Sequence, residues 1–223
     1  MQLLTHTASP TTAGRVARPS QAGPIPTAAE DEVLARWQFH RISEYERSSA
    51  ESFIAAQFMK AYGACITEFM PDLMGLYDGQ TIAAACGLRA AATGPMFLEQ
   101  YLDQPADTAI EKMTGLQTGR CRMIEVGNLS ISRPGYARHL VYWLTMHLRS
   151  IGMRWAVFSA VPALRNNFQR LGIPLITLGP ASADKLSAEA RASWGTYYDQ
   201  QPQVTAVSVD TAFRVLGENP CNP

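Results

Sequence analysis

Hydrophobic positions recur along the chain with two spacings, one typical of helices and one typical of strands. The clearest helical period lies in residues 135–152, where Gly152 follows the last apolar position. Residues 43–64 repeat this spacing, and Ser43 stands ahead of Glu46 at the separation of a capping box. The pattern predicts one helix in each segment.

Strand-like segments alternate with helical ones. Apolar or alternating residues predict strands at 33–42, 121–131, 154–161, 174–179 and 203–209, and residues 72–91 predict two strands joined by Asp78-Gly79. Further helices are predicted around 97–102 and 107–116, over 162–172 and within 183–198. This order predicts an α/β fold with a mixed sheet. Residues 121–178 also predict right-handed crossovers and a parallel segment.

The composition is that of one globular domain. The chain of 223 residues is 47% hydrophobic, and its 19 basic residues balance its 19 acidic ones, so no overall field favours DNA as a partner. Residues 1–28 are rich in Pro, Ser, Thr, Gly and Ala, which predicts a disordered tail. We expect a single domain over 29–216 and a second flexible tail over 217–223.

The sequence also predicts a cytoplasmic protein without a membrane partner. No run approaches the ~18 apolar residues that span a bilayer, and the N-terminus lacks the regions of a signal peptide. The four cysteines are too scattered for a zinc site or a disulfide framework, and no metal is expected. Cys65 and Cys86 lie in apolar surroundings, which predicts two small buried side chains.

A glutamate stands inside an apolar strand in EVGNLSISRPGYARHL, residues 125–140. A carboxylate there is costly unless it is paired or faces a cavity. Glu125 is therefore either a general base with a raised pKa or a member of a buried ion pair, for instance with Arg89, Arg122 or Arg154. Asn128 alternates onto the opposite face unless Gly127 introduces a bulge, and its alternative role is to bond nearby backbone.

The strand leads into a helix through a turn that contains Arg133, Pro134 and Gly135. A helix N-terminus can bind a phosphate through its free N–H groups, and glycine allows close approach. Pro134 removes one such donor. A connection that merely needs Gly135 is the alternative.

The order of elements resembles the GNAT superfamily of acyltransferases. More narrowly, EVGNLSISRPGYARHL, WAVFSAVPALRNNFQRLGI and WGTYYDQQPQV are similar to the thermostable hemolysin family, over about residues 61–207. The resemblance implies a GNAT-like mixed sheet, flanked by helices and splayed between its fourth and fifth strands. In the GNAT loop Q/R-x-x-G-x-G/A, this chain supplies Gly135, Tyr136 and Ala137, with Ser132 in place of the first Arg or Gln.

The resemblance also implies roles for particular residues. Glu125 and Asn128 would be catalytic, as similar glutamates occur at this strand in acyl-homoserine-lactone synthases. Phe168 stands near the place of the tyrosine that protonates the leaving thiolate in many GNAT enzymes. The residues expected to bind the donor are Arg133, Gly135, Tyr136, Ala137, Arg138, Arg165 and Asn166. The residues expected to line the acceptor pocket are Ser159, Tyr197 and Tyr198.

Plain structural roles remain open for several of these residues. Arg165 and Asn166 could cap their helix, Ser159 could be a satisfied core serine, and the two tyrosines could serve packing. The arginines near the turn could equally form a solvated face.

The function implied is N-acyl transfer to the amine of a small-molecule acceptor, with no permanently bound cofactor. The donor would be an acyl-phosphopantetheine thioester, and the reduced loop favours acyl-carrier protein over acyl-CoA, with aminoacyl-tRNA left open. The alternatives are a membrane-lytic protein and a non-catalytic binding module.

Overall fold

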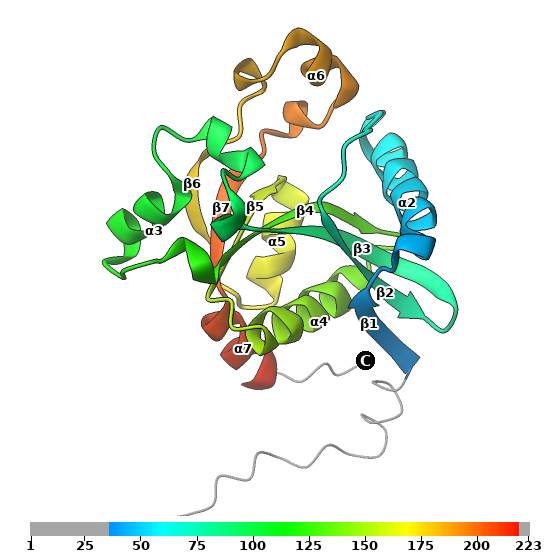
Figure 1. The fold of residues 1–223 in the computed structure, drawn as a ribbon, viewed down its shortest axis with the longest axis horizontal. Helices are drawn as coiled ribbons and strands as arrows, with labels where there is room; N and C mark the ends of the chain where they lie inside the picture. Colours follow the sequence, from blue (N-terminus) through cyan, green and yellow to red (C-terminus); the bar gives the residue numbers. More distant parts are fainter. Residues whose placement is uncertain (1–35, 219–223) are drawn as a thin grey trace, which may run out of the picture.

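The computed structural model describes residues 36–218. The tail predicted at 1–28 and the last five residues of the segment 217–223 lie outside this range. Within it the chain forms one seven-stranded sheet with helices on both faces (Figure 1). The predicted α/β class with a mixed sheet is confirmed.

The sheet runs in the order β1-β2-β3-β4-β5-β7-β6. Strands β4 and β5 pair in parallel, and every other neighbouring pair is antiparallel. The prediction of a parallel segment therefore holds for β4 and β5 alone, because β7 is inserted between β5 and β6. The strands are β1 (Trp37–Arg41), β2 (Asp72–Asp78), β3 (Thr81–Ala90), β4 (Met123–Ile131), β5 (Trp155–Ala160), β6 (Ile176–Pro180) and β7 (Gln203–Ser208).

Most predicted helices are present. The α-helices are α2 (Glu44–Tyr62), α3 (Ala106–Thr114), α4 (Tyr136–Ser150), α5 (Pro162–Arg170), α6 (Ala188–Ser193) and α7 (Val209–Glu218). Short 3₁₀ turns lie at η1 (Ala91–Thr93), η2 (Phe97–Tyr101), η3 (Arg120–Arg122), η4 (Ala183–Lys185) and η5 (Tyr198–Gln200). Helix α7 was not predicted, and it extends past the expected domain boundary at residue 216.

Local signals in the sequence explain where the first elements begin and end. The Ser43 hydroxyl accepts from the Glu46 N–H while the Glu46 carboxylate accepts from the Ser43 N–H, which is the predicted capping box of α2. The predicted hairpin between β2 and β3 is present, but its turn is Gly79-Gln80, one position later than Asp78-Gly79, because Asp78 still pairs with Thr81. Gly79 adopts a φ of 62° in this turn. Cys86 is buried as expected, but Cys65 is exposed, because it lies between Ala64 and Ile66, whose side chains turn inward.

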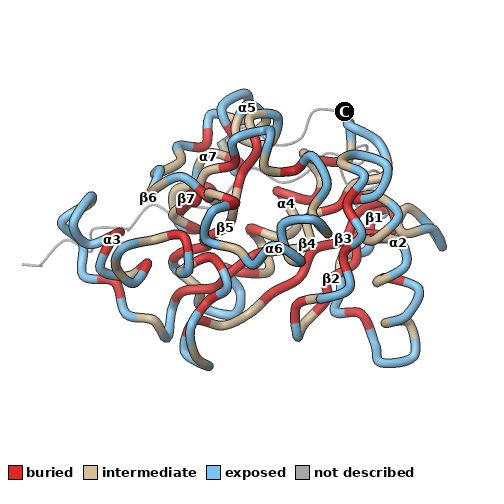
Figure 2. Tube along the Cα trace, turned by 90° about the horizontal axis from the view of Figure 1, so that it is seen from above, coloured by how far each residue is buried: buried red, intermediate tan, exposed pale blue. Residues whose placement is uncertain are grey.

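The two faces of the sheet are covered differently. Helices α4, α5 and α7 cover one face, where Leu140, Phe168 and Leu216 pack against β4 and β5 in one hydrophobic core. The other face is covered in two parts. Helix α2 packs over β2 to β4, and the segment from η1 to α3 packs over β4, β5 and β7. Figure 2 shows the buried stretches concentrated along the strands.

Strands β4 and β5 part early. Their parallel pairing covers three positions and ends at Glu125 and Val157. Beyond this point β4 stays paired with β3, and β5 stays paired with β7. The parting opens the sheet between its fourth and fifth strands, as the GNAT resemblance implied.

Candidate active site

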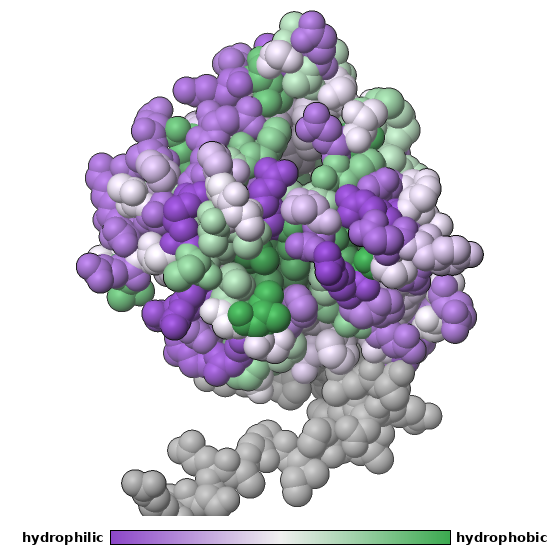
Figure 3. Space-filling model, in the orientation of Figure 1, coloured by the Kyte–Doolittle hydropathy of each residue, from purple (hydrophilic) through white to green (hydrophobic). Residues whose placement is uncertain are grey.

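A cavity of about 620 Å³ lies where β4 and β5 part. It reaches from the α2 and η2 side of the sheet to the first turns of α4 and α5. The molecular surface is hollowed between the α2 and α6 regions (Figure 3). The apolar lining of the cavity toward α4 and α5 consists of Val126, Leu129, Ile131, Ala137, Leu140, Val141, Val161, Ala163 and Leu164.

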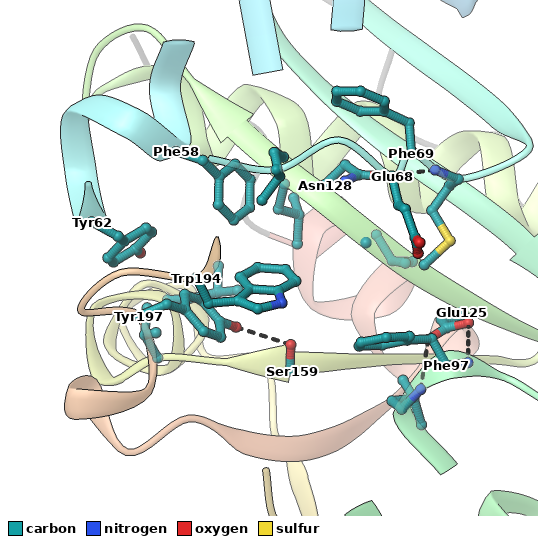
Figure 4. Close-up of a pocket in the computed structure, with 18 of the residues that line it drawn as sticks. Phe58, Tyr62, Glu68, Phe69, Phe97, Glu125, Asn128, Ser159, Trp194 and Tyr197 are labelled. Carbon is teal, nitrogen blue, oxygen red and sulfur yellow. Dashed lines mark hydrogen bonds between the residues drawn. The ribbon is translucent and has the colours of Figure 1, made fainter. Parts of the chain in front are cut away.

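Glu125 stands at the edge of this cavity, at the last paired position of β4. Its side chain is 2% exposed. One carboxylate oxygen, Oε1, accepts from the Leu98 N–H at 2.9 Å, and Oε2 accepts from the Phe97 N–H at 3.0 Å. Both donors belong to the first turn of η2 (Figure 4). The segment between β3 and β4 therefore fixes the orientation of the carboxylate.

Two opposing effects act on the pKa of Glu125. Burial raises the pKa, and the two N–H donors and the Arg89 guanidinium lower it, with burial the larger effect. The Arg89 Nη1 lies 3.7 Å from the Glu125 Oε2. Glu125 therefore both forms an ion pair with Arg89 and borders the cavity. Arg89 and Glu125 are direct cross-strand partners in β3 and β4.

Asn128 reaches the same face of the sheet as Glu125 through a bulge. The register between β3 and β4 shifts next to it, and its φ is 51°, in the left-handed region. Its Oδ1 accepts from the Met70 N–H at 2.9 Å. The sequence predicts a bulge at Gly127, one residue early, and the bond to the Met70 N–H agrees with the alternative role of Asn128.

The segment that carries Met70 packs directly against two glycines, Gly87 and Gly127, which pair across β3 and β4. A Cβ at Gly87 would lie 2.4 Å from the Met70 Cβ, and a Cβ at Gly127 would lie 2.5 Å from the Met70 Cε. The absence of side chains here lets residues 66–70 cross the sheet closely and form one wall of the cavity.

The turn before α4 is partly closed to a phosphate. The Tyr136 N–H bonds the Arg133 carbonyl at 3.0 Å, and the Ala137 N–H bonds the Pro134 carbonyl at 3.3 Å. Ser132, which replaces the expected Arg or Gln, donates from its N–H and its hydroxyl to the carbonyl of Ala83. Four donor groups of this loop are therefore engaged within the protein.

Gly135 itself is required by neither backbone nor packing. Its φ of −61° suits any residue, and a Cβ there would meet nothing within 4 Å. The alternative of a connection that merely needs glycine is thus not supported. The open space beside the N-terminus of α4 leaves room for a ligand.

The arginines expected to bind the donor have different surroundings. Arg133 is exposed, with its guanidinium 5.5 Å from the Tyr136 ring centre. Tyr136 packs edge-on against Trp37, and its hydroxyl donates to Asp78 at 3.3 Å, so its ring serves packing. Arg138 is half-buried, and its Nε has no hydrogen-bond partner among the described residues.

Helix α5 presents a different asparagine from the one expected. Asn167 lines the cavity, whereas Asn166 is exposed to solvent one position earlier on the helix. Arg165 donates to the Ala160 carbonyl at 3.3 Å, which ties it to the end of β5 and is not the helix cap considered as its alternative role. Phe168 stacks on Phe158 in the core, at 5.3 Å between ring centres, and lies outside the cavity lining.

Ser159 and Tyr197 meet across the cavity. Their hydroxyl oxygens are 2.9 Å apart (Figure 4), and both residues line the cavity. Tyr198 does not line it, because its hydroxyl turns to that of Tyr101 at 2.6 Å. Burial raises the pKa of Tyr197 well above its ordinary value, so this hydroxyl stays protonated at neutral pH.

Sequence reasoning did not identify the aromatic wall of the cavity. The aromatic residues lining it besides Tyr197 are Phe58, Tyr62, Phe69, Phe97 and Trp194. Phe58 belongs to the apolar stripe of α2, so periodicity indicated a core position only. Trp194 lies in the motif WGTYYDQQPQV, in which the tyrosines alone are predicted to line the pocket.

The family described as thermostable hemolysin matches residues 40–213. The chain belongs to the thermostable hemolysin family. No curated protein matches it significantly. Within the described residues of this family member, no helix has the length and apolar character needed to cross a membrane.

Several solved structures share the fold of this thermostable hemolysin family member. FeeM, an N-acyl amino acid synthase from uncultured soil microbes, is 15% identical, with a TM-score of 0.56 over 79% of this chain and 93% of FeeM. The apo form of TofI is 12% identical, with a TM-score of 0.58 over 81% and 95%. The AHL synthase LasI is 10% identical, with a TM-score of 0.54 over 81% and 93%. The expected GNAT-like fold is confirmed.

Proposed function

We propose that this protein transfers an acyl group from a phosphopantetheine thioester to the amine of a small molecule. The observation that carries the proposal is the parting of β4 and β5 directly after Glu125 and Val157. It places a buried carboxylate at one side of a cavity that extends to the first turn of α4. A thioester arm entering between the strands would bring its carbonyl carbon next to that carboxylate.

In the proposed reaction the amine nitrogen attacks the thioester carbon. A C–N bond forms, the C–S bond breaks, and the amine gives a proton to Glu125. Backbone groups of β4 beyond Glu125 lack a β5 partner and are free to bond the amides of the donor arm. The leaving thiolate takes a proton from the Ser159–Tyr197 hydroxyl pair, since Phe168 cannot supply one. Glu125 then releases the amine proton to solvent, and solvent restores the proton of the hydroxyl pair.

The N–H donors of Phe97 and Leu98 also support this role for Glu125. They hold the carboxylate in one orientation, while burial keeps its pKa above the ordinary value. A base oriented in this way is preorganised for proton transfer. The names of FeeM and LasI describe synthases of acylated compounds, which agrees with acyl transfer here.

Among the possible donors, acyl-carrier protein is favoured over acyl-CoA. A CoA thioester presents a pyrophosphate, and the loop at α4 has the N–H groups of Tyr136 and Ala137 engaged in its own turn. A carrier thioester presents one phosphodiester, which needs fewer donors. Exposed Arg133 beside this turn would contact an acidic carrier.

The direct test is incubation of the purified protein with acyl-CoA and acyl-carrier thioesters and a panel of amines, with products identified by mass. Acylated amine formed by wild type and lost in Glu125→Gln is expected. Absence of product with every donor and acceptor would favour a non-catalytic binding module instead.

A further inference from the structure

Arg89 stands in the cavity with most of its hydrogen-bonding capacity unused. Its side chain is 32% exposed, and it lines the cavity beside Glu125. Its one ion pair is with Glu125, at 3.7 Å, which is too long for a hydrogen bond. Within the part of the chain that the structure describes, the Arg89 guanidinium donates no hydrogen bond.

Two arginines of similar exposure show what a structural role looks like in this protein. Arg120 donates to Glu99 and to the carbonyls of Ala91 and Gly94. Arg47 donates to the carbonyls of Met70 and Pro71 and pairs with Glu51. Arg89 has no comparable set of partners, although a guanidinium presents five N–H donors.

Acidic residues outnumber basic ones among the described residues that line the cavity. Among the described lining residues, Arg89 is the one cation, whereas Glu125 is accompanied by exposed Glu68 and Glu189. Figure 4 shows Glu68 reaching toward the part of the cavity where Glu125 and Phe97 lie. A ligand that carries both an ammonium group and an anion would satisfy both signs of charge.

The topology assigns Arg89 to the acceptor rather than to the donor. Arg89 is on β3, and β4 separates it from the opening between β4 and β5. A donor arm that enters through this opening approaches Glu125 from the β5 side. The group that Arg89 binds therefore comes from the molecule on the other side of Glu125.

We propose that the acceptor is an α-amino acid whose carboxylate binds Arg89 while its amine lies next to Glu125. The inference rests on the proposed acyl transfer and specifies its acceptor class. A guanidinium binds a carboxylate through two parallel hydrogen bonds. In an α-amino acid a single carbon separates the carboxylate from the amine, which matches two side chains that are direct cross-strand neighbours.

Matched pairs of acceptors test this directly. L-Phenylalanine and 2-phenylethylamine differ only by the carboxylate, as do L-leucine and 3-methylbutylamine, and their apolar side chains suit the aromatic wall. Wild type should prefer each amino acid by about 10²-fold in kcat/KM, because the amine leaves Arg89 without a partner. Arg89→Gln should reduce this preference to about threefold or less. Arg122→Gln, which removes an exposed arginine outside the cavity lining, should retain it.

A binding measurement keeps this inference separate from the proposed function. Calorimetric titration of wild type with each pair should show tighter binding of the amino acid even if no donor supports turnover. If Arg89→Gln does not fold, Arg89→Lys keeps the charge without the planar fork and should show an intermediate preference. Equal use and equal binding of amino acid and amine by wild type would overturn the acceptor assignment while leaving acyl transfer intact.

Discussion

Glu125 and Val157 are the last residues at which β4 and β5 pair. One position thus serves two purposes: it closes the parallel ladder and places a carboxylate where the sheet opens. Glu125 borders the cavity, yet its side chain is only 2% exposed. Both of its carboxylate oxygens accept hydrogen bonds from backbone N–H groups of η2. The backbone supplies the polar partners that burial removes from water.

Replacement of Glu125 by Gln should lower turnover by ~10²–10⁴-fold, because the variant cannot accept the amine proton. Glu44→Gln is the matched control, since Glu44 is exposed and lies outside the cavity lining. Single-turnover rates with saturating donor, together with circular dichroism to establish folding, provide the measurement. A folded Glu125→Gln protein with wild-type turnover would exclude its role as base.

The stability of the protein should depend on pH through Glu125 with a definite sign. Burial raises the pKa of Glu125 in the folded state. Such a carboxyl group contributes most to stability below its unfolded pKa of about 4.3, and this contribution is lost as the pH rises through the folded pKa. The free energy of unfolding of wild type, relative to Glu125→Gln, should therefore decrease as the pH rises from about 4.

Urea unfolding of both proteins over a series of pH values measures this difference. If the relative stability of wild type instead increased with pH, the N–H donors and Arg89 would outweigh burial, and the pKa of Glu125 would be lowered.

Gly87→Ala should destabilise the protein more than Gly127→Ala. The new Cβ at Gly87 would meet the Met70 Cβ, which moves only with the backbone, whereas at Gly127 it would meet the flexible Met70 Cε. Overpacking of this kind costs about 1–3 kcal/mol. Met70→Ala itself removes a buried side chain. Relative to Met70→Ala, adding Gly127→Ala should cost little, whereas adding Gly87→Ala should still be costly. Thermal and urea unfolding of the three single and two double variants would show whether the order is reversed.

Asn128 should tolerate Gly better than Ala. Both substitutions remove the hydrogen bond to the Met70 N–H, worth about 1 kcal/mol. Alanine adds the cost of a left-handed φ, about 1–2 kcal/mol, whereas glycine does not. Urea unfolding of both variants measures the difference. Equal losses would mean that the bulge relaxes when the side chain is removed.

Periodicity predicted most elements because the residues that set them are local. Ser43 and Glu46 form the cap of α2, and Gly79-Gln80 forms the hairpin turn directly after Asp78. In each case the residues that set the element lie within three positions of one another. Helix α7 was missed because the apolar alternation of β7 continues into its first residue, Val209. Val209, Ala212, Phe213 and Leu216 nevertheless follow the i, i+3, i+4, i+7 spacing of an amphipathic helix, so a local signal for α7 was present. Ala212 and Leu216 pack in the core that α7 shares with α4 and α5.

The candidate site was only partly predictable for the same reason. Glu125 stood out because a carboxylate in an apolar strand is unusual in any context. The partners of Glu125 at Phe97 and Leu98 come from a distant turn and act through their backbone, so side-chain chemistry could not indicate them. Tyr198 was placed in the pocket from its neighbour Tyr197, but the two rings lie nearly perpendicular, at 85°, and their hydroxyls have different partners.

Preference for a carrier protein should depend on the charge beside the α4 turn. Arg133→Glu reverses an exposed charge there and should lower kcat/KM about tenfold with acyl-carrier protein, while the value with acyl-CoA changes much less. Rising ionic strength should weaken the carrier reaction in wild type, since screening reduces the attraction between exposed charges. Lys112→Glu, an exposed reversal on α3, is the control and should affect neither donor. The measurement is steady-state kinetics with one acyl group on both donors. Equal or better use of the CoA thioester, together with no effect of Arg133→Glu, would show that the engaged N–H groups of Tyr136 and Ala137 rearrange to bind a pyrophosphate.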